Sequence, residues 1–155
     1  MSEQQPVFLA GDVGGTKTNL ALFTGAAGVR SPMYEQTLPS GAFETLEDLV
    51  EAFLRGAEVR PARAAFGVAG PVVEGEARIT NLPWHLSEQR LSRRLGLDRV
   101  DLVNDLVAIA RAVPVLEDSD THTLNEGEPV ARGPIAVVAP GTGLGEAYLV
   151  WHEDG

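Results

Sequence analysis

The amino-acid sequence predicts an α/β protein in which a mixed β-sheet is covered by helices. Two observations carry this prediction. Strand-like apolar runs alternate with amphipathic helical segments as far as residue 113. In addition, a unit of strand, glycine-threonine turn and strand occurs twice, in "VFLAGDVGGTKTNLALF" and in "PIAVVAPGTGLGEAYLVW". Two such matches at corresponding points indicate a duplicated architecture.

The first elements are three strands and a helix. The apolar run at 7–12 predicts a buried strand, and 19–23 predicts a second strand that pairs with it across a glycine-rich turn. Residues 31–39 can supply a third strand. From Phe43 onward, apolar residues recur at steps of three and four, which predicts an amphipathic helix that Gly56 terminates.

The middle of the chain contains two strands, a hairpin and a helix. Residues 62–70 form a small-residue strand, and the following segment predicts a hairpin that turns at "EGE". The next helix has Ser87 as its N-cap and Gly96 as its stop. The apolar run at 99–104 predicts another strand.

Helical spacing follows at 105–113 and ends at Pro114. The polar residues from there to 133 read as a connector that can contain one short strand. We therefore expect a first domain at 1–113, a connector at 114–133 and the start of a second domain at 134–155.

Composition excludes several classes of function. The 155-residue chain has 12 basic and 22 acidic side chains, a formal net charge of −10 that disfavours binding to nucleic acid. It contains no cysteine for disulfides or thiolate metal sites. No apolar run is long enough to span a bilayer, and "MSEQQP" lacks the features of a signal peptide. These absences indicate a cytoplasmic protein.

The stretch "GDVGGTKTNLALF" has the composition of a phosphate loop but not the spacing of either helix-entering motif, the Walker loop or the dinucleotide fingerprint. What remains is a hairpin turn whose N–H groups can form an anion-binding concavity. Gly14 and Gly15 allow close approach of phosphate oxygens, while Thr16 offers a hydroxyl and Lys17 a charge. Asp12 is placed to hold Mg²⁺ through water. The alternative is an ordinary tight hairpin with a solvated lysine.

These residues resemble the phosphate motif of the actin–hexokinase–Hsp70 superfamily of ATP-dependent enzymes. Within it, the whole chain looks like the N-terminal part of bacterial glucokinase. The matching stretches are "GDVGGTKTNLALF", "GVAGPV", "TNLPW", "LVNDLVAIA" and "GTGLG", in the order of that family. The resemblance implies two ribonuclease-H-like domains, of which this chain holds the first and the opening hairpin of the second. It also implies a phosphate-binding hairpin from each, the second formed by Gly141, Thr142 and Gly143.

The resemblance also implies roles for individual residues. Asp105 would be the catalytic base, Asn104 would hold sugar hydroxyls, and Asn81 and Gly70 would lie near the sugar. The position of "LVND" supports this, because ligands of open α/β sheets collect at the carboxyl edge of the strands. A carboxylate there can accept the proton of a sugar hydroxyl that attacks the γ-phosphorus. The alternatives are that Asp105 only caps its helix, that Asn81 is a turn residue and that the glycines serve packing.

The function implied is that of a glucokinase, which transfers phosphate from ATP with Mg²⁺ to D-glucose in glycolysis. Its partners would be glucose and ATP, and full-length members of the family would form homodimers. A chain with one lobe and a single hairpin of the other would have little activity alone. Two alternatives remain open: a catalytically dead fragment, or a repressor-type kinase or regulator that acts on another hexose or an N-acyl amino sugar.

Overall fold

The computed structural model describes residues 5–25, 28–79, 81–140 and 143–152. The chain divides into two compact units, Met1–Asp105 and Leu106–Gly155. The predicted domain limits of 1–113, 114–133 and 134–155 stay a prediction. None of the described helices has the length and apolar character that a membrane span requires.

The first unit is built on a mixed sheet of five strands in the order β3-β2-β1-β4-β8. The pairs β1–β2 and β2–β3 are antiparallel, whereas β1–β4 and β4–β8 are parallel. The strands are β1 (Val7–Val13), β2 (Lys17–Thr24), β3 (Tyr34–Pro39), β4 (Arg63–Val68) and β8 (Arg99–Asn104). All five predicted strands of this unit are confirmed, and the sheet is mixed as the alternation of elements predicts.

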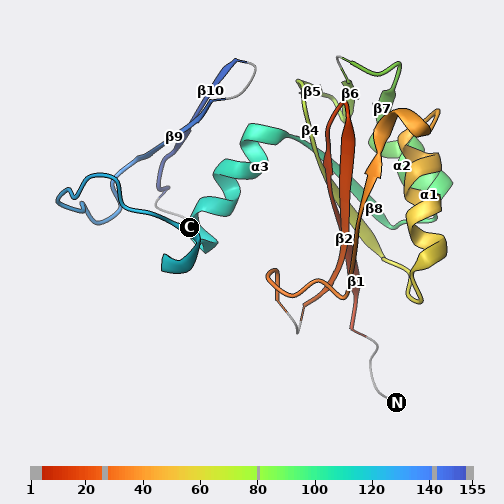
Figure 1. Cartoon of the computed structure of the whole chain (residues 1–155), viewed down its shortest axis with the longest axis horizontal. Coiled ribbons are helices and arrows are strands. Elements are labelled where there is room, and N and C mark those ends of the chain that lie inside the picture. Colours follow the sequence, from red (N-terminus) through yellow and green to blue (C-terminus); the bar gives the residue numbers. More distant parts are fainter. Residues whose placement is uncertain (1–4, 26–27, 80, 141–142, 153–155) are drawn as a thin grey trace. The chain divides into compact units, whose positions relative to one another are not determined.

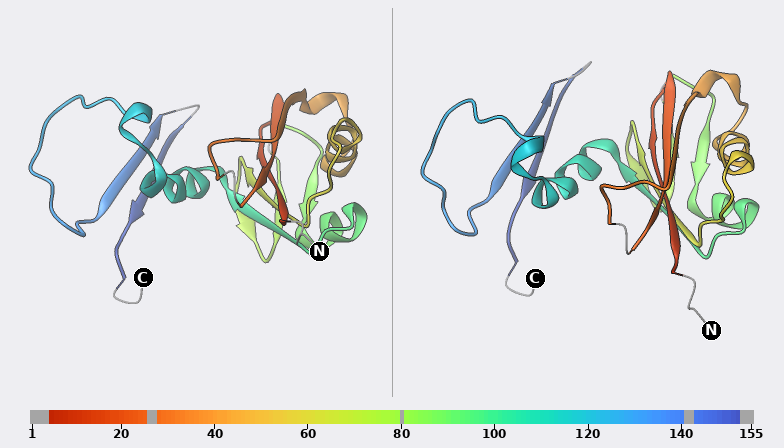
Figure 2. Two further views of the ribbon diagram at one scale, coloured as in Figure 1. Left: turned by 90° about the horizontal axis from the view of Figure 1, so that it is seen from below. Right: turned by 60° about the horizontal axis from the view of Figure 1, so that its bottom comes forward.

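Two helices cover one face of this sheet, α1 (Leu46–Gly56) and α2 (Glu88–Leu95) (Figures 1 and 2). Alternate strand residues point toward them, since side chains along a strand alternate between faces. Phe66 on β4 and Phe53 on α1 are fully buried in the resulting core. The opposite face is largely exposed: Ala10, Asp12 and Ala65 all lie open among the described residues.

The ends of the helices follow their sequence signals in part. Thr45 caps α1, because its side chain accepts a hydrogen bond from the Asp48 N–H at 3.1 Å. Gly96 ends α2 in the left-handed conformation, with φ of 67°, as predicted. Gly56 is the last residue of α1, so the predicted helix end is confirmed, but Gly56 does not take a left-handed conformation. A Cβ there would lie 2.5 Å from the Tyr34 hydroxyl, so a larger residue would displace the end of that side chain.

A small antiparallel sheet lies beside the main one, in the order β5 (Val72–Val73), β6 (Glu76–Arg78) and β7 (His85–Ser87). The predicted hairpin turn is confirmed, and Glu74 and Gly75 take the positive φ values of 52° and 75°. Strand β7 is not expected from the sequence. The short run "HLS" carries too little pattern to be recognised before its partner β6 is known.

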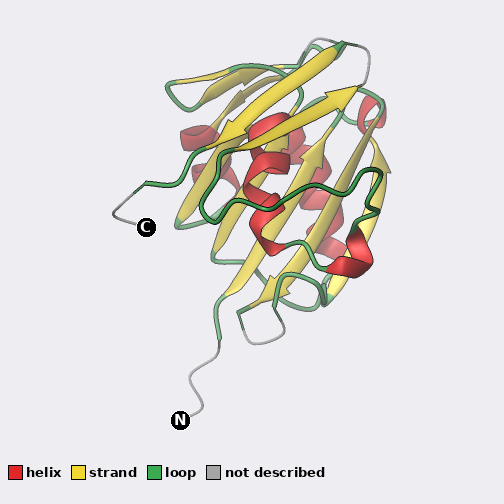
Figure 3. Cartoon of the chain, turned by 90° about the vertical axis from the view of Figure 1, so that its left-hand side faces the viewer, coloured by secondary structure: helices red, strands yellow, loops and turns green. Residues whose placement is uncertain are grey.

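The second unit contains little buried surface. Its elements are the rest of α3 (Asp105–Ala112) after Asp105, two 3₁₀ turns, and the antiparallel strands β9 (Ile135–Pro140) and β10 (Leu144–Leu149) (Figure 3). No strand forms between 114 and 133, where the sequence allowed one. Among the described residues of this unit only Ala110 is buried. The second predicted hairpin is thus present without a core of its own.

Candidate functional site

The carboxyl ends of three parallel strands meet at one edge of the main sheet. The register places Val13 of β1 beside Val68 of β4, and Val68 beside Asn104 of β8. Asp12 lies one residue before the end of β1, and Asp105 directly follows β8. The structure therefore brings Asp12 and the Asn104–Asp105 pair to the same edge, on strands that are separated only by β4.

The turn between β1 and β2 is closed by a hydrogen bond from the Gly14 N–H to the Lys17 carbonyl, at 3.1 Å. Ser40, which directly follows β3 and is fully buried, holds this turn by hydrogen bonds from the core side. Its hydroxyl donates to the Gly14 carbonyl at 2.8 Å, and its N–H donates to the Thr16 carbonyl at 3.0 Å. The buried Thr18 hydroxyl lies 2.9 Å from the Ser40 Oγ and completes the network. Two carbonyls of the turn are thus fixed toward the protein.

The same turn leaves donors unused. Within the described part of the chain, the N–H groups of Gly15 and Thr16 donate to no protein atom. The Lys17 side chain is exposed beside them. Gly15 also packs against Asn81, because a Cβ at Gly15 would lie 3.1 Å from the Asn81 Cβ. Adjacent free N–H donors beside a cation form a concavity that suits an anion.

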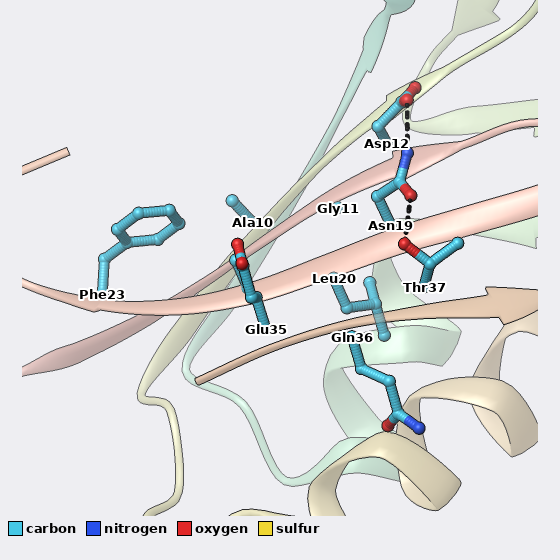
Figure 4. Close-up of a pocket in the computed structure, with 10 residues that line it drawn as sticks. Ala10, Gly11, Asp12, Asn19, Leu20, Phe23, Glu35, Gln36 and Thr37 are labelled. Carbon is cyan, nitrogen blue, oxygen red and sulfur yellow. Dashed lines mark hydrogen bonds between the residues drawn. The ribbon is translucent and has the colours of Figure 1, made fainter. Parts of the chain in front are cut away.

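Asp12 is the end of a short chain of side-chain hydrogen bonds (Figure 4). Asn19 Nδ2 donates to Asp12 Oδ2 at 3.2 Å, and Thr37 Oγ1 donates to Asn19 Oδ1 at 2.8 Å. These residues line a shallow groove of about 590 Å³ on the exposed face of the sheet. Asn104 and Asp105 do not line that groove.

Asn104 ties the end of β8 to the loop after β4. Its Nδ2 donates both to the Gly70 carbonyl, at 3.1 Å, and to Asp105 Oδ1, at 2.9 Å. Gly70 has a φ of 153°, and a Cβ there would lie 3.1 Å from the Arg78 carbonyl, so the position requires glycine. By register Asn104 ends β8 on the face of the helices, whereas Asp12 points to the exposed face. Asp105 is the first residue of α3, and the Asn104 amide holds its carboxylate by the 2.9 Å hydrogen bond.

The remaining predicted site residues belong to the second hairpin. Gly143 lies in the turn between β9 and β10 and is exposed. Gly141 and Thr142 lie outside the described residues. His85, on the neighbouring strand β7, is exposed and its Nε2 lies 3.1 Å from Glu76 Oε2.

Three polar residues around the site were not singled out from the sequence: Asn19, Thr37 and Ser40. Asn19 could have been found by counting, because a four-residue turn at Gly14–Lys17 pairs Asp12 with Asn19 across the hairpin. Thr37 and Ser40 depend on the register of β3, which no local signal gives.

The described residues contain no group of three or more His, Asp or Glu side chains arranged to hold a metal ion. A lone exposed carboxylate still fits Mg²⁺, which commonly keeps several waters and binds through one or two carboxylates plus substrate phosphates. Asp12 satisfies this requirement, because only its Oδ2 is engaged by Asn19. When bound, Mg²⁺ would neutralise phosphate charge beside the Gly14–Lys17 turn.

Comparison with known proteins decides the family. The family model described as Glucokinase matches residues 9–155, nearly the whole chain. The chain belongs to the glucokinase family. The glucokinase of Synechocystis sp. is 41% identical over 154 residues, and that of Nostoc punctiforme is 37% identical over 147. The matches cover 92% and 93% of this chain but 43% of each relative. The chain thus spans less than half the length of these glucokinases.

Solved glucokinase structures have the same fold. A glucokinase from an Antarctic psychrotroph superposes with a TM-score of 0.86 at 32% identity, covering 97% of this chain and 48% of that one. A Balamuthia mandrillaris glucokinase solved in complex with glucose gives 0.72 at 22% identity, covering 99% and 47%. A ROK-family glucokinase from Streptomyces griseus, in complex with glucose and AMPPNP, gives 0.65 at 19% identity, covering 93% and 44%. These likenesses confirm the predicted fold class and the resemblance to the N-terminal part of glucokinase.

Proposed function

We propose that this chain forms the phosphate-positioning and base-carrying part of a glucokinase that transfers the γ-phosphoryl group of ATP to D-glucose. Family membership gives the reaction class, a hexose phosphotransfer. The observation that carries the assignment to residues is the meeting of the Gly14–Lys17 turn, Asp12 and the Asn104–Asp105 pair at one edge of the sheet. Two structural relatives solved with glucose, one of them also with AMPPNP, support the choice of ligands.

The turn and Asp12 would act on the nucleotide. The free N–H groups of Gly15 and Thr16 would donate to phosphate oxygens, and Lys17 would add a positive charge. Asp12 would hold Mg²⁺ through water. Gly141, Thr142 and Gly143 would contribute further contacts to the nucleotide phosphates. Phosphoryl transfer depends almost entirely on such positioning and charge stabilisation.

Asp105 and Asn104 would act on the sugar. A glucose hydroxyl oxygen would attack the γ-phosphorus, its proton would pass to the Asp105 carboxylate, and the bond from the phosphorus to ADP would break. Asn104 holds Asp105 Oδ1 by a hydrogen bond and would bind sugar hydroxyls at the same place. Asn81 and Gly70 would contribute to the sugar site, since Asn81 lies against Gly15 and the Gly70 carbonyl is held by Asn104.

A chimera tests this proposal, with residues 1–155 replacing the matching part of Synechocystis glucokinase. Asp105→Asn should lower kcat about 10²–10⁴-fold, the usual contribution of a general base. Asp98→Asn is the matched control, because Asp98 is an exposed carboxylate just before β8. It removes the same charge and should leave kcat unchanged. Full glucose phosphorylation by Asp105→Asn would reject the assignment.

The chain by itself should have little activity, because its second unit buries almost no apolar surface. An assay of residues 1–155 with ATP, Mg²⁺ and glucose measures this, and turnover comparable to the chimera would reject it. A panel of glucose, mannose and N-acetylated amino sugars on the chimera separates a glucokinase from a kinase or regulator for another hexose. We place the reaction in the cytoplasm, as the composition indicates.

A further inference from the structure

We infer that Asn19 and Thr37 are positioning residues that fix the orientation of the Asp12 carboxylate for a hydrated divalent cation. The inference deepens the proposed function and rests on it where the cation is concerned. The three residues and Gly67 form one row across four strands, because the register pairs Thr37 with Asn19, Asn19 with Asp12, and Asp12 with Gly67.

The hydrogen-bond direction along this row is determined by chemistry. An ionised carboxylate only accepts hydrogen bonds, so Asn19 must turn its NH₂ group toward Asp12. Its carbonyl oxygen then faces β3, where the Thr37 hydroxyl donates to it at 2.8 Å. Both ends of the Asn19 amide are therefore specified, and the 3.2 Å contact engages Asp12 Oδ2 alone.

On the other side of Asp12 the register partner is Gly67 of β4, which carries no side chain. Any other residue at position 67 would place a side chain next to Asp12 on the same face of the sheet. Glycine there removes that neighbour. The row thus engages one carboxylate oxygen from β2, and among the described residues no side chain donates to the other, which stays available for a water-mediated metal contact.

A purely structural pair would behave differently from a positioning one. Cross-strand polar pairs contribute roughly 0.2–1 kcal/mol to a sheet, and their loss would weaken every property of the site equally. A positioning role predicts a selective loss instead. Groups that orient a metal-binding carboxylate typically change metal affinity about 10–100-fold.

The first measurement uses residues 1–155 without ligand. The ¹⁵N order parameter of the Asn19 side-chain NH₂ group should exceed that of Asn125, which lies in the exposed loop before β9. Thr37→Val should lower it, and Thr37→Ser, which keeps the hydroxyl, should restore it. An Asn19 side chain as mobile as Asn125 in the unsubstituted chain would overturn the inference without bearing on the proposed function.

The second measurement uses the chimera and AMPPNP, with Mg²⁺ or with EDTA. Asn19→Leu should lower the Mg²⁺-dependent gain in AMPPNP affinity about 10-fold and leave the affinity in EDTA unchanged. Thr37→Val should lower the same Mg²⁺-dependent gain by a smaller factor, and Thr37→Ser should restore the gain. Gln36→Leu, on the neighbouring residue of β3, is the control.

The outcomes separate the two ideas. If the Asn19 and Thr37 variants lost AMPPNP affinity equally with Mg²⁺ and with EDTA, the row would have only a structural role and the inference would be overturned. No AMPPNP binding by the unsubstituted chimera, together with an ordered Asn19 amide, would reject the proposed nucleotide site and the cation role of the row with it. An ordered amide combined with a selective, Mg²⁺-dependent loss would support both.

Discussion

Ser40→Ala should destabilise the first unit through the turn that it holds. The substitution removes the hydroxyl that donates to the Gly14 carbonyl at 2.8 Å and contacts the Thr18 hydroxyl at 2.9 Å. Ser40 and Thr18 are both fully buried, so water does not replace the missing partner. The Gly14 carbonyl loses its donor at the same time.

The loss in free energy of unfolding depends on the buried polar groups that Ser40→Ala leaves without a hydrogen-bond partner. Leaving a buried polar group unsatisfied costs about 1–3 kcal/mol, and we expect about 2 kcal/mol for Ser40→Ala. With the urea dependence usual for small domains, this corresponds to a midpoint lower by about 1 M. Ser87→Ala is the matched control, because the Ser87 side chain makes no capping hydrogen bond at the start of α2.

Trp84 reports the unfolding of this unit, since it is 3% exposed in the core, while Trp151 is exposed in the other unit. Urea titrations by fluorescence in a Trp151→Phe background therefore isolate the relevant transition. Thr18→Val supplies a double-mutant cycle with Ser40→Ala. Ser40→Ala already leaves the Thr18 hydroxyl without its partner, so Thr18→Val removes a group that no longer contributes its hydrogen bond. The loss in free energy of unfolding in the double variant should therefore be smaller than the sum of the two single losses by about 0.5 kcal/mol or more. Strict additivity, or a Ser40→Ala protein as stable as Ser87→Ala, would refute the network.

Three further results are expected. The pKa of Asp48 lies below its ordinary value of 3.8 because Thr45 donates a hydrogen bond to its carboxylate. The stabilisation this gives is present above pH 3.8 and is lost as the pH falls through the folded-state pKa. In acid titrations, Asp48→Asn should therefore flatten the decline in the free energy of unfolding below about pH 4. Gly96→Ala, at a φ of 67°, should cost about 1 kcal/mol in urea unfolding, and an unchanged midpoint would contradict a left-handed cap. Gly15→Ala should push the turn away from Asn81 and weaken AMPPNP binding by the chimera, while full binding would show that close approach at this turn is unnecessary.

The sequence predicted the elements well because the local signals were strong. The strand at β8 and the helix end at Gly96 follow directly from an apolar run and a glycine. Gly56 also ends α1 as predicted, although it does so without the left-handed conformation that Gly96 adopts. Strand β7 was missed because its pairing with β6 determines it more than its own three residues do.

The site was predictable only along single segments. Asp12 and the Asn104–Asp105 pair stand at the ends of recognisable strands, so their shared edge follows from parallel pairing. The residues that hold the site come from a neighbouring strand and its exit, Thr37 and Ser40. Their contribution depends on the register of β3, and register is set by the packing of a whole face rather than by any short pattern.

The two hairpins share a sequence pattern but differ in what supports them. The strands of the first alternate between buried and exposed positions, and Ser40 fixes its turn from within the core. Neither strand of the second hairpin has a fully buried residue. A two-stranded ribbon is marginally stable in water without a packed face. The first turn is therefore organised by this chain alone, whereas the strands β9 and β10 have no packed apolar face among the described residues of their unit.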